Sequence, residues 1–180
     1  MILVEGLSDR CAVEALAERC GRDLRAEGVS IVPMGGATNI GHFLEHLGPH
    51  GLDLKLAGMC DAAEEGHFLR GLERAGFGRD LSRREMEALG FYVCIEDLED
   101  ELIRALGADC VEQAVAAEGE LGSFRILQKQ PAQRANDVEQ QLRRFMGSRS
   151  GRKSRYARLL VEALEPERVP RPLERALGHV

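Results

Sequence analysis

The stretch that decides the fold is Met1-Ile2-Leu3-Val4-Glu5-Gly6-Leu7-Ser8-Asp9. Its short apolar run predicts a β-strand that ends on the carboxylate Glu5. Gly6 then predicts a turn, Ser8 is suited to cap a helix, and Asp9 falls in the first turn of that helix. Open α/β sheets bind their ligands at such strand ends. Two acids there indicate a site for a hard divalent cation such as Mg²⁺ or Mn²⁺, because these ions prefer oxygen ligands.

Alternating strand and helix patterns predict the architecture of the rest of the chain. The predicted strands span 2–4, 29–33, 54–60 and 91–95. The predicted helices span 8 to about 25, 39–47, 98–106, 108–118, 137–145, 154–164 and 172–177. Strands that alternate with helices favour a parallel sheet with right-handed crossovers. We therefore expect an α/β core at 1–106 and a helical extension at 107–180 that packs on this core.

Composition narrows the class of protein. The 180 residues, 44% hydrophobic and 30% charged, are typical of a soluble globular protein with one domain or one domain and a helical appendage. No apolar run approaches the roughly 18 residues that a membrane span needs, and no signal-peptide pattern opens the chain. We therefore expect a cytoplasmic protein with no membrane partner. The five cysteines are scattered without a CxxC pair, so neither a disulfide framework nor a zinc ribbon is indicated.

More carboxylates follow the predicted third and fourth strands. They are Asp61, Glu64, Asp97 and Glu99. Because the carboxyl ends of parallel strands meet at one edge of a sheet, we expect these acids to lie near Glu5. Clustered carboxylates repel one another, and a bound cation relieves that repulsion. The alternative is that several of them only complement helix dipoles at helix N-termini.

The segment 140–161 is basic in a chain whose net charge is −6. It contains seven arginine and lysine residues and no acid. The candidates for contacts with phosphate groups are Arg144, Arg149, Arg152, Arg155 and Arg158. Such contacts would be salt-dependent and blind to sequence, whereas a solvated helix surface is the alternative explanation. An acidic site beside a basic segment suits a metal-dependent enzyme that acts on a polyanion.

One further motif competes with this interpretation. His42-Phe43-Leu44-Glu45-His46 matches H-x-x-E-H, a signature of some zinc peptidases. No third ligand is identifiable, and Gly48 and Pro49 predict that the helix ends before His50. We therefore interpret the motif as a solvated helical face.

Four motifs together resemble the ordered motifs of a TOPRIM domain, in the variety found at the C-terminus of OLD-family (overcoming lysogenization defect) nucleases. They are Val4-Glu5-Gly6-Leu7-Ser8-Asp9, Gly35-Gly36-Ala37-Thr38-Asn39-Ile40, Gly58-Met59-Cys60-Asp61 and Asp97-Leu98-Glu99. The VEGxSD string with spaced downstream acids is fairly specific. The resemblance covers residues 1 to about 106 and extends more loosely through Gly151-Arg152-Lys153.

The resemblance implies a Rossmann-like sheet of about four parallel strands and an endonuclease that cleaves DNA with Mg²⁺ or Mn²⁺, using two ions. The family's metal-binding acids fall on Glu5, Asp9, Asp61 and Glu99, with Asp97 beside the last. Glu5 is also implied to be catalytic. A family lysine falls on Lys153, where it would stabilise charge that develops on the phosphate.

The chain departs from the family in two respects. The second acid of the family's DxD motif is replaced by Ala63, for which Glu64 or Glu65 are the candidate substitutes. No GxxxxGK[ST] motif is present, so we expect either a stand-alone domain or the partner of a separate ATPase subunit. Two alternatives therefore stay open: a TOPRIM module that binds nucleic acid or a partner without cutting, and a TOPRIM enzyme that acts on RNA.

Overall fold

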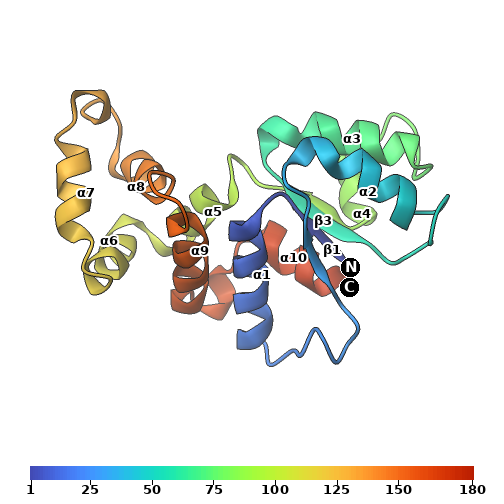
Figure 1. Ribbon diagram of the computed structural model, residues 1–180, viewed down its shortest axis with the longest axis horizontal. Coiled ribbons are helices and arrows are strands. Elements are labelled where there is room, and N and C mark those ends of the chain that lie inside the picture. Colours follow the sequence, from blue (N-terminus) through green and yellow to red (C-terminus); the bar gives the residue numbers. More distant parts are fainter.

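The computed structural model describes residues 1–180 and contains one parallel sheet with helices on both faces (Figure 1). Its strands are β1 (Ile2–Val4), β2 (Ile31–Pro33), β3 (Ala57–Cys60) and β4 (Phe91–Val93). They lie side by side in the order β2-β1-β3-β4, and every neighbouring pair is parallel. This confirms the predicted α/β class, although three of the strands are shorter than predicted. All four carboxyl ends consequently meet at one edge of the sheet.

Ten α-helices surround and extend this sheet. They are α1 (Leu7–Arg19), α2 (Ile40–Leu47), α3 (Glu65–Arg74), α4 (Arg83–Ala88), α5 (Leu98–Leu106), α6 (Ala108–Ala117), α7 (Leu121–Gln128), α8 (Val138–Met146), α9 (Arg152–Ala163) and α10 (Arg171–His179). Short 3₁₀ turns at Ala37–Asn39, Ala62–Glu64, Pro131–Gln133 and Pro166–Arg168 connect several of them. No helix is long and apolar enough to cross a membrane.

Strand side chains alternate between two hydrophobic clusters, one on each face of the sheet. Leu3 and Phe91 face the smaller cluster, which α2, α3 and α4 cover. Ile2 and Val4 face the larger cluster of 30 residues, which includes side chains of α1, α5, α9 and α10. The smaller layer, α2 and α3, lies at the upper right of Figure 1, and α1 and α10 lie below the sheet.

The helical portion is continuous with this larger cluster. Tyr156 and Leu160 of α9 and Leu173 of α10 belong to the same cluster as Ile2 and Val4 of β1. In Figure 1, α6, α7 and α8 form an arm that projects to the left, whereas α9 lies beside α1 and α10 lies against the sheet. The last two helices thus complete the core that β1 begins.

Helix α1 corrects two details of the prediction. The helix begins at Leu7 rather than at Ser8, and Gly6 is its N-cap residue. The carboxylate of Asp9 accepts the Gly6 N–H at 2.8 Å, so the acid takes the capping role predicted for Ser8. The helix ends at Arg19 rather than near 25, because Gly21 follows in the left-handed conformation that commonly stops a helix.

Candidate metal centre at the carboxyl edge of the sheet

Glu5 is held by both neighbouring strand ends. Its carbonyl oxygen accepts the N–H groups of Gly35 and Gly36, each at 3.1 Å, in the turn after β2. Its side-chain Oε1 accepts the N–H of Asp61, after β3, at 3.0 Å. Burial raises the pKa of the Glu5 carboxyl, and the bond from Asp61 only partly offsets that effect.

Three acids from two strand ends and one helix turn line a single small cavity. Glu5, Asp9 and Asp61 surround a space of about 10 Å³, whose other walls are the side chains of Met59, Cys60, Cys94 and Leu98. That space is about what one water-sized particle needs. The apolar walls explain the low local polarity that the carboxylates experience.

The electrostatics of the cluster favour either protonation of its carboxylates or binding of a cation. Burial, followed by repulsion from Glu5, raises the pKa of Asp61 to about 8. Burial also raises the pKa of Asp9 to about 7, with further repulsion from Glu99 and Glu5. Carboxylates that would hold protons near neutral pH are short of positive charge, and a divalent cation supplies it.

Glu99 brings a fourth carboxylate with one oxygen to spare. The residue is 2% exposed, and its Oε2 lies 2.9 Å from Nζ of Lys153. Its Oε1 is buried without any hydrogen-bond partner. An unpaired buried carboxylate oxygen is costly, so this atom is available for a cation. Although burial lowers the pKa of the Lys153 ammonium, the charge and hydrogen bond of Glu99, together with the charges of Asp97 and Asp9, raise it overall.

Asp97 uses both of its carboxylate oxygens within the protein. Oδ1 accepts the N–H of Asp100 at 2.8 Å and so caps α5. Oδ2 accepts Nε of Arg143 from α8 at 2.6 Å. Asp97 therefore fixes the start of the helix that carries Glu99, and neither oxygen is free in this conformation.

The residues after Asp61 show what remains at the altered DxD position. Ala63 is exposed and has no oxygen to offer. Glu65 is bound to Arg83, with both of its oxygens engaged at 2.9 and 2.5 Å. Glu64 is 3.6 Å from His67, and its charge acts on Glu5. Of the two candidate substitutes, Glu64 is therefore the freer.

The donor set fits a hard divalent cation, although the side chains are not gathered around one point. No three His, Cys, Asp or Glu side chains stand in a geometry that would hold one ion together. The fit rests instead on chemistry: the donors are carboxylate oxygens, one of them is buried without a partner, and two titrate near neutrality.

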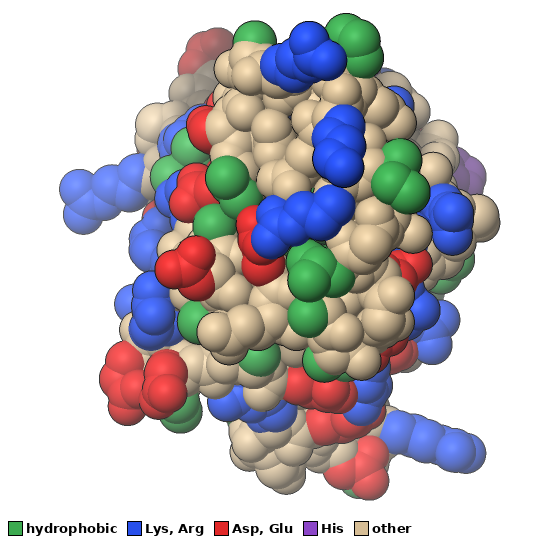
Figure 2. Space-filling model, turned by 90° about the vertical axis from the view of Figure 1, so that its left-hand side faces the viewer, with side chains coloured by type: hydrophobic (Ala, Val, Ile, Leu, Met, Phe, Trp, Pro, Cys, Tyr) green, Lys and Arg blue, Asp and Glu red, His purple; other side chains and the backbone are tan.

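The basic candidates divide into three groups. Arg152 is 4% exposed and engaged inside the protein, so the prediction that it contacts nucleic acid does not agree with its burial. Arg155 and Arg158 are occupied by ion pairs with Glu120 and Glu18. Arg144 and Arg149 form no ion pair and line a groove of about 290 Å³ between α7 and the turn that joins α8 to α9. Figure 2 views the molecule from the side of the helical arm and shows Lys and Arg side chains from the top to the centre of this face.

The H-x-x-E-H motif behaves as a surface helix. α2 ends at Leu47 before His50, as predicted, and Nδ1 of His46 lies 2.9 Å from the carbonyl of His42. Glu45 pairs with Arg74, and no third ligand is near.

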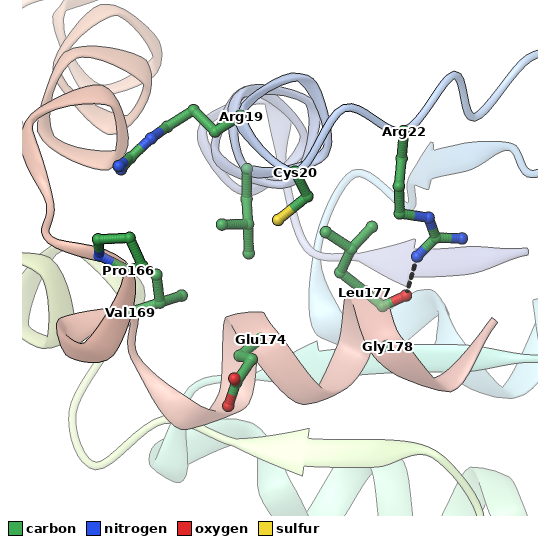
Figure 3. A pocket seen from close by; sticks show the side chains of 9 residues that line it. Arg19, Cys20, Arg22, Pro166, Val169, Glu174, Leu177 and Gly178 are labelled. Atoms are coloured by element: carbon green, nitrogen blue, oxygen red, sulfur yellow. Dashed lines mark hydrogen bonds between the residues drawn. The ribbon is translucent and has the colours of Figure 1, made fainter.

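A larger cavity, of about 380 Å³, lies at the other end of α1 (Figure 3). Apolar side chains including Leu16, Val169 and Leu177 line it. Arg22 donates to the Leu177 carbonyl at 2.6 Å, and Arg19 donates to that of Val161. Leu16 and Cys20 follow Asp9 by 7 and 11 residues, so this cavity lies roughly 10–17 Å from Asp9 along the axis of α1. It shares no residue with the acidic cavity.

The order β2-β1-β3-β4 with acids at the strand ends defines the class of protein: a TOPRIM-type α/β fold with a helical C-terminal portion. Residues 1–62 match the family model described as "Overcoming lysogenization defect protein-like, TOPRIM domain". The predicted resemblance to the TOPRIM domain of OLD proteins is thereby confirmed.

Solved structures extend the likeness over the helical portion. The C-terminal region of the OLD protein of Xanthomonas campestris pv. campestris is 26% identical with a TM-score of 0.71, and the match covers 99% of this chain and 92% of that chain. The C-terminal region of the Burkholderia pseudomallei OLD protein is 23% identical with a TM-score of 0.73, covering 99% and 94%. No curated protein sequence matches the chain.

Proposed function

We propose that the chain is a divalent-metal-dependent endonuclease that hydrolyses phosphodiester bonds of DNA. The observation that carries the proposal is the shared cavity of Glu5, Asp9 and Asp61, with the partnerless oxygen of Glu99 coupled to it electrostatically. Apolar walls around several acids are what a metal-dependent hydrolytic site needs, since charge interactions are strong there.

The proposed ligands of Mg²⁺ or Mn²⁺, two ions in the full site, are Glu5, Asp9, Asp61 and Glu99, with Glu64 in support. When bound, a divalent ion supplies Lewis acidity and lowers the pKa of water. Asp97 is assigned a supporting place, because it holds the start of α5 against Arg143. Lys153 would bring its positive charge to the scissile phosphate, because its ammonium already lies beside Glu99.

DNA is the proposed partner, and the surface proposed for it includes Arg144 and Arg149. Both side chains are exposed and free of ion pairs, so they can neutralise phosphate groups without first breaking a contact. Arg155 and Arg158 would have to leave their acidic partners to do the same. A separate ATPase subunit is a further proposed partner, supported by the resemblance alone.

The direct test is nicking of supercoiled plasmid by the purified chain with Mg²⁺ or Mn²⁺. We expect Glu5→Gln to lower the nicking rate at least 100-fold, because the variant loses a ligand charge at the centre of the site. Glu14→Gln is the matched control, since Glu14 lies on α1 and pairs only with Arg10 at 2.7 Å. Undiminished cutting by Glu5→Gln, or cutting that persists in EDTA, would refute the proposal.

The exposed Ala63 favours a second candidate, a module that binds nucleic acid or a partner without cutting. The same assay separates the two functions. Binding without turnover in Mg²⁺, Mn²⁺ and Ca²⁺ would support the module, and faster cleavage of RNA than of DNA would support an RNA enzyme. We expect Ala63→Asp, which restores the acid of the DxD motif, to raise the nicking rate if the endonuclease assignment is correct.

A further inference from the structure

Arg152 is a buried cation at the start of α9 with contacts to three other residues. It is 4% exposed, and it donates to the Phe145 carbonyl at 3.0 Å and to Oγ of Ser148 at 2.6 Å. Its guanidinium lies 4.0 Å from the centroid of the Phe145 ring. These contacts fasten the start of α9 to the end of α8.

Glu120 is the acid that makes this burial tolerable. One of its oxygens accepts from Arg152 at 2.8 Å, and the other accepts from Tyr156 Oη at 2.9 Å and from Arg155 at 2.5 Å. Burial raises the pKa of Glu120, but the bonds from Arg152 and Tyr156, together with the charges of Arg152 and Arg155, lower it overall. A buried cation is stable only when it is paired and hydrogen-bonded. Glu120 supplies the ion pair, although Nε of Arg152 is buried without a hydrogen-bond partner.

Lys153 needs such an anchor because its own position in the helix is unfavourable. It stands in the first turn of α9, where the helix dipole repels a cation. The N-cap residue Gly151 is left-handed and offers no side-chain cap. The Lys153 ammonium nevertheless reaches 2.9 Å from Glu99 on α5. The residue directly before it, Arg152, binds the end of α8 and Glu120, whereas Arg155 of the same turn binds only Glu120 and Glu118.

We propose that Arg152, through Glu120 and the Phe145 carbonyl, is a positioning residue that fixes the first turn of α9 and so holds Lys153 against Glu99. Its consequence for catalysis rests on the proposed function. The contact between Lys153 and Glu99 does not depend on the proposed function, so its maintenance by Arg152 can be tested without a cleavage assay.

The three lysines of the chain, Lys55, Lys129 and Lys153, make a direct test possible. The native protein is treated with an amine-acetylating reagent, and the labelling rate of Lys153 relative to Lys129 is measured by mass spectrometry. We expect Arg152→Ala to raise this ratio at least three-fold, because Lys153 leaves Glu99. Glu120→Gln should also raise the ratio. Glu99→Gln removes the ion pair itself, so it gives the labelling ratio expected for a fully unpaired Lys153.

Val111→Ala is the control for general loosening, because Val111 is fully buried in α6 and its apolar side chain forms none of the hydrogen bonds or ion pairs of this network. An unchanged ratio in folded Arg152→Ala and Glu120→Gln would overturn the proposal. So would a rise in Val111→Ala as large as the rise in Arg152→Ala.

A double-mutant cycle adds the catalytic readout. If Arg152 acts through Lys153, Arg152→Ala should slow nicking at least ten-fold in the native chain but at most two-fold in a Lys153→Ala background. If Arg152→Ala slows nicking by the same factor with and without Lys153, the two substitutions act independently, and a positioning role is contradicted. Failure of the native chain to nick any substrate would count against the proposed function and leave the labelling result standing.

Discussion

Asp61 has the clearest electrostatic consequence of any single residue. Its folded-state pKa of about 8 lies above the ordinary 3.8, so the folded protein binds more protons than the unfolded chain between about pH 4 and pH 8. Stability without metal must therefore fall as pH rises through that window. Allowing for screening, we expect a loss on the order of 1–3 kcal/mol between pH 5 and pH 8.

Urea unfolding in EDTA at the two pH values measures this loss. Asp61→Asn should flatten the pH dependence and stabilise the metal-free protein at pH 8, whereas Asp109→Asn at an exposed site should not. Saturating Mg²⁺ should recover stability at pH 8 in the native chain and less in Asp61→Asn. A metal-free protein that is equally stable at pH 5 and pH 8 would contradict the account.

Single residues also mark the limit of what the sequence can predict about the site. Strand topology alone places Glu5 and Asp61 at one edge. The bond between Asp97 and Arg143, 46 residues apart, has no local signal. The burial of Arg152 has none either, because the basic segment looks uniformly solvated until the partner Glu120, 32 residues away, is known.

At the scale of elements, the turn after β2 determines how Glu5 is presented. Gly36 has φ +121°, which residues with side chains rarely adopt, and its N–H donates to the Glu5 carbonyl. Gly36→Ala should cost about 1–3 kcal/mol of unfolding free energy and weaken Mg²⁺ binding. Thermal unfolding and calorimetric titration measure the two effects.

Gly122→Ala is the matched control in α7. A Cβ there meets nothing within 4 Å, and alanine suits a helix better than glycine, so a gain of about 0.5–1 kcal/mol is expected. If Gly36→Ala proves as harmless as Gly122→Ala, the turn does not hold Glu5.

Element prediction succeeded where periodicity was strong and failed where elements were short. All four strands and most of the C-terminal helices fall within a few residues of their predicted positions. The helices α3, α4 and α7 carry no prediction, since α4 has only 6 residues and α7 contains Gly122. The start of α1 was predicted one residue late, because Gly6 rather than Ser8 is the N-cap residue and Asp9 accepts its N–H.

At the scale of the whole molecule, the core and the helical portion should unfold together. Leu160 of α9 is fully buried in the cluster that also contains Ile2 and Val4. Leu160→Ala should therefore cost about 2–5 kcal/mol, and probes in the sheet and in the arm should report one coincident transition. Leu52→Ala, at a side chain that is mostly exposed, should change stability by less than about 0.5 kcal/mol. Two separate transitions would show that residues 107–180 form an independent unit.

Long-range packing is also the part of the fold that the sequence leaves open. The predicted boundary between core and helical extension at residue 106 follows from the loss of the strand pattern. The sequence does not show that α10 packs against β3 and β4. Nor does it show that α8 and α9 pack on α5 and that α9 packs on α1, which brings Arg143 and Lys153 to the acidic edge.

The central claim, that acids from separate strand ends hold divalent cations, is tested most directly by a crystal soaked in Mn²⁺ and measured at the manganese absorption edge. The account predicts anomalous peaks within ligand distance of Glu5, Asp9 and Asp61, with Glu99 Oε1 turned to the same ions. A well-ordered crystal in which the Glu5–Asp61 cavity stays free of manganese at millimolar concentration would contradict it.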